Sequence, residues 1–191
     1  MKSVKGSKTE KNLLAAFAGE SQARNRYTYF AGVAEKAGLQ QIAAIFRETA
    51  DNEREHAKQF FKHLEGGEVE ITASFPAGII GDTLANLEAA ASGEHMEWSV
   101  LYKEAAATAK AEGFDSISDL FLNISKIEAH HEKRYRALWQ NLKDGKVFKK
   151  DKTVVWICRN CGHLHEGSEA PNVCPTCLHA RAFFELLEEN Y

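Results

Sequence analysis

The chain has 191 residues, with 24 basic and 27 acidic side chains and a formal net charge of −3. Neither sign forms a long run, so we expect no nucleic acid and no anionic membrane surface as a partner. No stretch approaches the roughly 20 apolar residues that cross a bilayer, and the polar N-terminus lacks the apolar core of a signal peptide. We therefore expect a cytoplasmic protein with one ordinary core and a small appendage.

Four helices are predicted in the first two-thirds of the chain. Apolar residues recur at helical spacing over 9–36, 40–65, 81–111 and 115–143. Gly38 and Gly113 mark short turns, whereas Gly66-Gly67 and Pro76 belong to a longer connection. Two short turns and one crossover predict a four-helix bundle made of two hairpins.

The character of the sequence changes after residue 146. Short apolar runs, Gly, Pro and all four cysteines replace the helical periodicity. We predict a four-helix-bundle domain at residues 1–146 and a small metal-binding domain at residues 147–191.

The two predicted hairpins look like copies of each other. Ala18-Gly19-Glu20 matches Ser92-Gly93-Glu94 at an offset of 74 residues, and Glu53-x-x-His56 matches Glu128-x-x-His131 at an offset of 75. This internal repeat predicts a bundle with a pseudo-twofold axis, and a site on that axis.

Each predicted helix carries one glutamate midway along its apolar stripe. A single glutamate of this kind is usually a surface residue. A set of four is different, because two of them are followed by a histidine three residues later, on the same helix face. Burying an ionised carboxylate without a partner costs on the order of several kcal/mol, and the facing positions lack a matching number of Lys or Arg. Two cations would neutralise the cluster, and carboxylates with imidazoles favour iron or manganese over zinc. The predicted ligands are Glu20, Glu53, His56, Glu94, Glu128 and His131, the general pattern of di-iron carboxylate bundles.

Three further residues near this cluster each allow two interpretations. Glu97, whose counterpart in the first hairpin is Ala23, is either a half-exposed residue at the edge of the stripe or an additional carboxylate that competes with His56. Tyr27 and Tyr102 either pack in the core or donate hydrogen bonds to the ligand carboxylates.

The four cysteines form two chelating turns, Cys158-x-x-Cys161 and Cys174-x-x-Cys177, separated by 12 residues. Clustered thiols in a reducing compartment indicate a metal rather than disulfides, and four thiolates suit a tetrahedral ion. The spacing leaves zinc and iron open. A di-iron site needs a supply of electrons, which favours iron. Trp156 and Phe183-Phe184 are expected to pack around this site.

With both sites in place, the full chain resembles a rubrerythrin. The resemblance is carried by both cysteine turns and by AGESQARNRY at 18–27, EREH at 53–56, GEHME at 93–97 and EAHH at 128–131. It implies an all-α ferritin-like four-helix bundle followed by a rubredoxin-like, zinc-ribbon-like metal-knuckle domain. One departure is Leu178, which follows the second cysteine turn where free rubredoxins usually have Gly, so the geometry of that turn could differ.

The resemblance also implies roles for individual residues. A di-iron centre, oxo- or carboxylate-bridged, has in its oxidised form the ligands Glu20, Glu53, Glu94, Glu97, Glu128 and His131. His56 replaces Glu97 on one iron upon reduction. A mononuclear iron is bound by Cys158, Cys161, Cys174 and Cys177. The expected catalytic residues are Glu97, His56, Tyr27 and Tyr102.

The implied activity is reduction of hydrogen peroxide in oxidative-stress defence. It is an NADH peroxidase activity, with electrons passing through the four-cysteine iron from an external rubredoxin or NAD(P)H-dependent reductase. A homodimer or higher homo-oligomer is expected. Two alternatives stay open: a ferroxidase or iron-storage protein, and a zinc-ribbon interaction module attached to a structural bundle.

Overall fold

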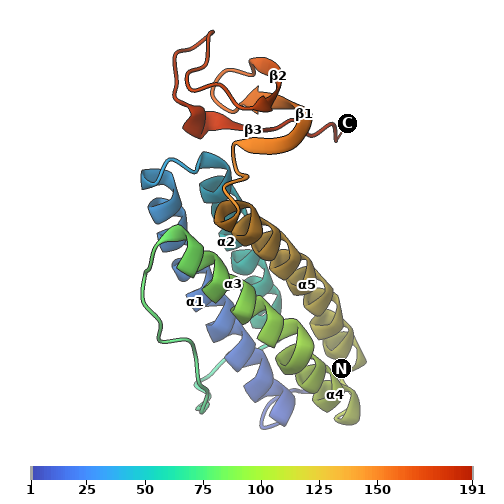
Figure 1. Cartoon of the computed structure of the whole chain (residues 1–191). Helices are drawn as coiled ribbons and strands as arrows, with labels where there is room; N and C mark the ends of the chain where they lie inside the picture. Colours follow the sequence, from blue (N-terminus) through green and yellow to red (C-terminus); the bar gives the residue numbers. More distant parts are fainter. Residues whose placement is uncertain (1, 191) are drawn as a thin grey trace.

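The computed structural model describes residues 2–190, which form a helical bundle and a small sheet (Figure 1). Helices α1 (Lys8–Lys36) and α2 (Gln40–Phe61) make the first hairpin. The second contains α3 (Thr83–Met96), the π-helix η1 (Glu97–Leu101), α4 (Tyr102–Ala111) and α5 (Asp115–Lys143). A crossover at 62–82 runs along the outside of the bundle and joins the hairpins. The predicted ferritin-like four-helix arrangement is confirmed.

The N-terminus of α1 is fixed by side chains that satisfy its free amide groups. Ser7 caps the helix and accepts a hydrogen bond from the amide of Glu10, while Glu10 accepts one from the amide of Gly6. The carboxylate of Glu112, at the turn before α5, accepts hydrogen bonds from the amides of Lys8 and Thr9. An anion at a helix N-terminus is favourable. The contact ties the start of α1 to the second hairpin.

The third predicted helix is not continuous, because η1 interrupts it at Glu97–Leu101. The repeat explains the interruption: Glu20 and Glu94 differ by 74 residues, whereas Tyr27 and Tyr102 differ by 75. One extra residue therefore lies between 94 and 102, and a π-helical turn accommodates it without rotating the rest of the helix. Glu97, whose counterpart in the first hairpin is Ala23, lies in this turn.

Two contacts from α5 hold η1 in place. The hydroxyl of Ser125 donates a hydrogen bond to the carbonyl oxygen of Trp98, at 3.1 Å. The indole N–H of Trp98 donates to the carboxylate of Glu132. A π-turn distorts the regular backbone ladder; the Ser125 hydroxyl supplies a donor to one of its carbonyl groups, and the Trp98 indole ties the turn to α5.

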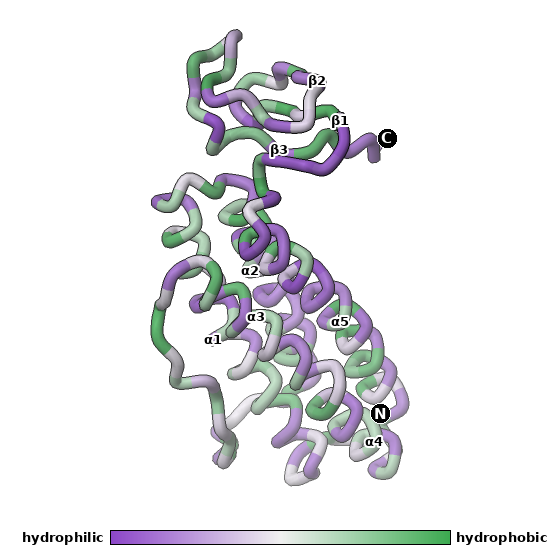
Figure 2. Tube along the Cα trace, in the orientation of Figure 1, coloured by the Kyte–Doolittle hydropathy of each residue, from purple (hydrophilic) through white to green (hydrophobic). Residues whose placement is uncertain are grey.

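The bundle core is divided into two apolar clusters. One contains Tyr27, Phe30, Phe46 and Tyr135, and the other contains Leu13, Phe60, Tyr102 and Phe121. Figure 2 shows hydrophobic and hydrophilic residues interleaved along each helix, as expected when one face is buried. Within residues 2–190, no helix is long and apolar enough to cross a membrane.

The C-terminal part is a three-stranded antiparallel sheet in the order β2-β1-β3. Its strands are β1 (Lys149–Cys158), β2 (Leu164–Glu169) and β3 (Phe184–Leu186), with a 3-10 helix, η2 (Arg181–Phe183), before β3. Trp156 and Phe184 are buried beside Cys158 and Cys174, and Phe183 packs against them, as predicted. The predicted domain boundary at 146/147 falls between α5 and β1 and stays a prediction.

Deletion of Ser99 tests the origin of η1. Because one inserted residue produces the π-turn, removing it should restore a regular α-helix and leave helical circular dichroism and cooperative unfolding intact. Deletion of Ala91, in the regular part of α3, is the matched control. It rotates the buried side chain of Leu87 by about 100° and should lower the melting temperature. Equal destabilisation by both deletions would show that the turn is not an insertion.

Candidate metal centres

Four glutamates from four helices meet in the middle of the bundle. Glu20 on α1, Glu53 on α2, Glu94 on α3 and Glu128 on α5 each expose at most 1% of their surface. They lie along the helices between the two apolar clusters. Carboxylates almost never have this burial unless they are paired or bind metal.

The ligand atoms fall into two groups that share two members. Glu20, Glu53, His56 and Glu128 form one, and Glu53, Glu94, Glu128 and His131 form the other; within each group the atoms lie within 4.8 Å of one another. Glu53 and Glu128 belong to both groups and are placed to bridge two ions. Each ion position then gains one further glutamate and one histidine.

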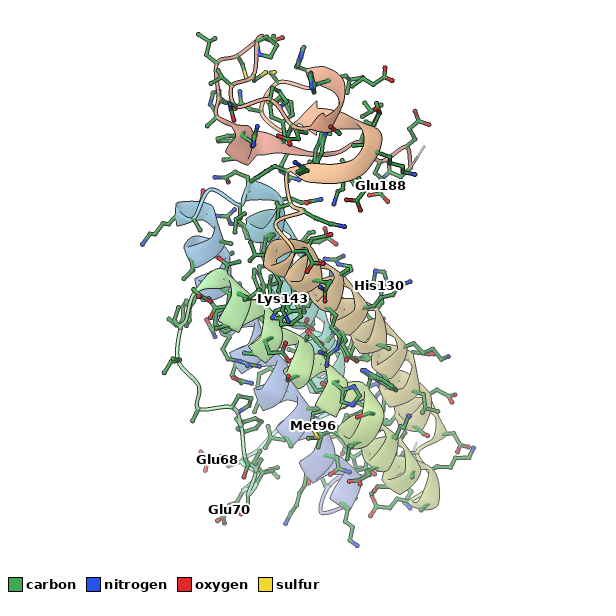
Figure 3. All side chains as sticks on the ribbon, viewed as in Figure 1. Glu68, Glu70, Met96, His130, Lys143 and Glu188 are labelled. Atoms are coloured by element: carbon green, nitrogen blue, oxygen red, sulfur yellow. The ribbon has the colours of Figure 1, made fainter. Side chains whose placement is uncertain are left out.

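The histidine nitrogens face the shared carboxylates. His56 Nδ1 lies 2.9 Å from an oxygen of Glu53 and 2.9 Å from an oxygen of Glu128. His131 Nδ1 lies 2.8 Å from Glu128 and 3.3 Å from Glu53. Its neighbour His130 is exposed and points away from the bundle (Figure 3), so only the second histidine of the pair reaches the site.

Buried polar atoms without partners show that the site fits cations. A nitrogen carries at most one proton, so two imidazoles cannot satisfy all the converging oxygens. Within residues 2–190, the following buried ligand atoms have no hydrogen-bond partner: Glu20 Oε2, Glu53 Oε1, Glu94 Oε2, Glu128 Oε1 and Oε2, and His131 Nδ1. Such orphaned atoms are rare in native cores, and two metal ions would satisfy them.

Two buried tyrosines orient the outer glutamates. The hydroxyl of Tyr27 donates to Glu94 Oε1, and that of Tyr102 donates to Glu20 Oε1, both at 2.6 Å. Each tyrosine therefore reaches across to the glutamate of the other hairpin, in addition to packing in the core. One carboxylate oxygen is fixed and the other stays free for an ion.

Glu97 lies outside both groups. It is half-buried in η1 and lines a cavity of about 410 Å³ together with Arg26 on α1 and Phe75 of the crossover. Loss of water around its carboxyl group, and then the charges of Glu128 and Glu53, raise the pKa of Glu97 well above its ordinary value. The residue therefore lies within electrostatic reach of the shared carboxylates without joining either group.

The pKa values of the buried ligands are shifted by burial and by the neighbouring charges. Burial, and then the charges of Glu53 and Glu128, raise the pKa values of Glu20 and Glu94 well above the ordinary value. Burial would also raise the pKa of Glu53, but His131 and His56 lower it to about 2. Conversely, burial would lower the histidine pKa values. Glu128 and Glu53 outweigh burial and raise the pKa of His56 to about 10 and that of His131 to about 9.

The thiols of the four cysteines converge on one point. All four cysteines lie in one cluster, with Sγ atoms of Cys158 and Cys177 3.8 Å apart and those of Cys161 and Cys174 3.7 Å apart. A tetrahedral ion with metal–sulfur bonds of about 2.3 Å separates its sulfurs by about 3.8 Å. The thiols therefore fit a single metal ion, as predicted.

The two cysteine turns have the same geometry, although their sequences differ. Gly162 and Leu178 each follow a Cys-x-x-Cys pair, with φ of 77° and 61°. The amide of each donates to the carbonyl of the first cysteine of its turn, at 2.8 and 2.9 Å. The suspected difference at Leu178 is therefore wrong: leucine adopts the left-handed conformation that glycine adopts more easily.

Two features of the bundle site were not predicted. The π-helix was visible in the sequence as a change of repeat offset from 74 to 75. Asn52, whose Oδ1 lies 3.3 Å from His131 Nε2, gave no periodicity signal because it lies at the edge of the apolar stripe.

The fold and the ligand groups define a ferritin-like di-iron carboxylate protein joined to a rubredoxin-like domain. The sequence profile of the rubrerythrin family matches residues 11–148, and that of the rubrerythrin rubredoxin-like domain matches residues 156–185. The chain belongs to the rubrerythrin family, oxidoreductases with a di-iron site and a four-cysteine, rubredoxin-like iron site.

Individual relatives agree with this assignment. The whole chain is 58% identical to rubrerythrin from Porphyromonas gingivalis, covering 95% of that protein, and 56% identical to all of rubrerythrin from Nitratidesulfovibrio vulgaris. Among solved structures, fully reduced (all-ferrous) nigerythrin matches with a TM-score of 0.63 and 30% identity, over 97% of this chain and 92% of nigerythrin. Desulfovibrio desulfuricans bacterioferritin, 22% identical over 73% of this chain and 82% of its own, matches with a TM-score of 0.63 and shares the fold.

Metal removal should make the bundle less stable as pH rises. Without metal, the raised pKa values of Glu20, Glu94, His56 and His131 mean that the folded state binds more protons than the unfolded state. The free energy of unfolding should therefore fall from about pH 5 to about pH 10; the lowered pKa of Glu53 acts in the opposite sense only below about pH 4.5. Urea denaturation of the chelated protein across this range measures the effect, and a flat profile would contradict it. The iron-loaded protein is the control, because metal replaces the protons.

Replacing Leu178 with glycine should stabilise the cysteine domain. The left-handed conformation costs leucine roughly 1–2 kcal/mol, and glycine's extra chain entropy offsets part of that gain. The side chain is 77% exposed, so little packing is lost. We expect Leu178→Gly to raise the free energy of unfolding by about 0.5–1 kcal/mol, followed through the metal–thiolate absorption during urea denaturation. Leu178→Ala keeps the Cβ and should give no gain; an equal gain from both variants would rule out backbone strain.

Proposed function

We propose that this protein reduces hydrogen peroxide to water at the di-iron centre, using electrons relayed through the four-cysteine iron. The observation that carries the proposal is the presence of both sites in one chain: a two-electron site for the substrate and a one-electron site for the donor. Electrons come from a rubredoxin or an NAD(P)H-dependent reductase, as an NADH peroxidase activity in cytoplasmic defence against oxidative stress.

Two ferrous ions would supply two electrons and a Lewis-acidic template for cleaving the O–O bond. The chain's own residues would hold this template. Glu53 and Glu128, which belong to both ligand groups, would be shared by the ions, and Glu20 and Glu94, oriented by Tyr102 and Tyr27, would each complete one group. The 2.6 Å hydrogen bonds from both tyrosines support these positioning roles.

Glu97 and His56 are proposed to alternate as ligands of one ion. His56 already belongs to the group with Glu20, Glu53 and Glu128, while Glu97 lies one helical turn after Glu94, at the wall of the cavity. The cavity that Glu97 lines has a volume of about 410 Å³, which is large enough for peroxide, so the carboxylate would stand beside the substrate when it is not a ligand.

The separation of the two sites supports a homo-oligomeric assembly. Glu128 lies 15 residues before the end of α5 at Lys143, about 22 Å along the helix axis, and the cysteine domain lies beyond that end (Figure 1). Electron transfer weakens steeply with distance, so transfer within one chain would be slow. A homodimer, or higher homo-oligomer, that places the cysteine domain of one copy beside the bundle of the other would shorten the path.

The proposed function is tested by comparing how fast the reduced protein consumes hydrogen peroxide and oxygen. Reduced protein should consume hydrogen peroxide faster than oxygen, with no mineral product. Faster consumption of oxygen with an iron mineral would instead support the ferroxidase and iron-storage alternative. Zinc in place of iron at the thiolates of protein purified from its native source would support the interaction-module alternative and contradict the electron relay.

Glu97→Ala tests the ligand exchange. We expect normal folding, an altered absorption spectrum of the oxidised di-iron site, and a peroxide turnover lowered about 10–100-fold, the range seen when groups around a metal are lost. The matched control is Glu104→Ala on the exposed surface of α4, which should leave the absorption spectrum and the peroxide turnover unchanged. Unchanged spectra and turnover in Glu97→Ala would refute the exchange.

Mixed dimers test the assembly. A chain with Cys158→Ala and Cys161→Ala lacks the electron entry, and a chain with Glu53→Ala and Glu128→Ala lacks the di-iron centre. Neither should turn over peroxide alone, but dimers containing one of each should recover turnover if electrons cross between copies. Inactive mixed dimers would show that transfer stays within one chain.

A further inference from the structure

The two ligand histidines are related by the pseudo-twofold axis, but their outer ring nitrogens have different surroundings. His131 Nδ1 faces Glu128 and Glu53, which leaves the proton of the neutral ring on Nε2 when Nδ1 binds a metal. Nε2 lies 3.3 Å from Oδ1 of the half-buried Asn52 on α2 and donates to it. The ring of His131 is therefore held from both sides.

His56 has no equivalent support. Its Nδ1 faces the same two carboxylates, but within residues 2–190 no hydrogen-bond partner is found for its Nε2. The repeat offset of 75 makes Ile127 the counterpart of Asn52. A hydrocarbon side chain accepts no hydrogen bond, and Ile127 is 40% exposed on α5. The difference in support between His131 and His56 therefore corresponds to a sequence difference at one pair of positions, Asn52 and Ile127.

A second contact braces the same side of the bundle. Arg134, one turn after His131 on α5, donates hydrogen bonds to Glu48 and Thr49 on α2, at 2.6 and 3.3 Å. Its repeat counterpart, Gln59, instead donates to Glu55 of its own helix. The helices are thus joined beside His131 by Asn52 and Arg134, and neither link is repeated beside His56.

We propose that Asn52 is a positioning residue that keeps His131 a permanent ligand, and that Ile127 at the equivalent position leaves His56 free to exchange with Glu97. The pair Asn52/Ile127 thereby decides which of two nearly symmetric metal positions changes its ligand. The proposal deepens the ligand exchange of the proposed function and rests on it. Outer partners of ligand histidines fix the ring orientation and raise the basicity of the ligand nitrogen.

Cobalt(II) binding to metal-free, full-length protein tests the role of Asn52 without any turnover. Thiolate absorption bands distinguish the cysteine site from the bundle. We expect Asn52→Leu to weaken one of the two bundle positions about 10–100-fold and leave the other unchanged. Asn52→Asp, which keeps an acceptor, should restore tight binding. Equal weakening of both positions, or no rescue by aspartate, would overturn the proposal.

A double-mutant cycle separates positioning from a general structural effect. Asn52→Leu should cost no further affinity in a His131→Ala background, but should keep its full cost in a His56→Ala background. The same cost in both backgrounds would mean that Asn52 does not act through His131. Circular dichroism of each metal-free variant checks that it folds.

Ile127→Asn tests the other half of the proposal. An acceptor at this position should hold His56, so that crystal structures of the oxidised and reduced iron-loaded protein both show His56 as a ligand. Exchange of His56 with Glu97 as in the unmodified chain would overturn the role of Ile127. The cobalt results do not depend on peroxide chemistry. If Asn52→Leu weakens cobalt binding only through His131, but the protein does not reduce peroxide, the proposed function is rejected while the positioning role of Asn52 stands.

Discussion

The bundle is organised around four carboxylates that are buried together with only two imidazoles beside them. Charged carboxylates in a low-dielectric interior carry a desolvation cost that two histidines cannot offset. Because of this cost, the pKa values of Glu20 and Glu94 are raised. Several buried carboxylate oxygens also have no hydrogen-bond partner among the described residues. Two cations resolve both. The other features of the bundle follow: apolar clusters at each end exclude water, and tyrosines fix the outer carboxylates.

The pseudo-twofold symmetry explains the site, and its exceptions explain why the two metal positions differ. One inserted residue produces η1 and brings in Glu97, which the first hairpin lacks. One polar-to-apolar difference, Asn52 against Ile127, changes the support of the histidines. Both exceptions favour a ligand change at the position that contains His56. Under the proposed ligand exchange, the two halves of this nearly symmetric site would respond differently to reduction.

Much of this was predictable because buried charge is rare. A glutamate in the middle of an apolar helical stripe stands out from local periodicity alone, and the spacing of Glu-x-x-His and Cys-x-x-Cys follows from reach along one element. The family resemblance supplied what periodicity did not, above all the partnership of the two metal sites and the exchange at Glu97.

The features that were missed depend on contacts between elements. Asn52 reaches a histidine on another helix, and the periodicity of one helix contains no information on that contact. For the same reason the hydrogen bond of Tyr27 to a ligand carboxylate was only one of two interpretations, and its partner, Glu94 of the opposite hairpin, was not specified. The π-turn was missed because a single inserted residue barely changes apolar spacing in a short window. At Leu178, the rule that leucine avoids the left-handed conformation was outweighed by the geometry that the four thiols impose on the turn.

The central claim is that cations, not protons, stabilise the buried carboxylates at neutral pH. Its most direct test is the number of metal ions per chain in the purified full-length protein, compared with a Glu53→Ala, Glu128→Ala double variant that lacks both bridges. The account predicts three ions per chain in the unmodified protein, two from the bundle and one from the thiolates, and one in the variant. An unmodified bundle that binds no ion at neutral pH and is as stable as the metal-loaded protein would contradict it.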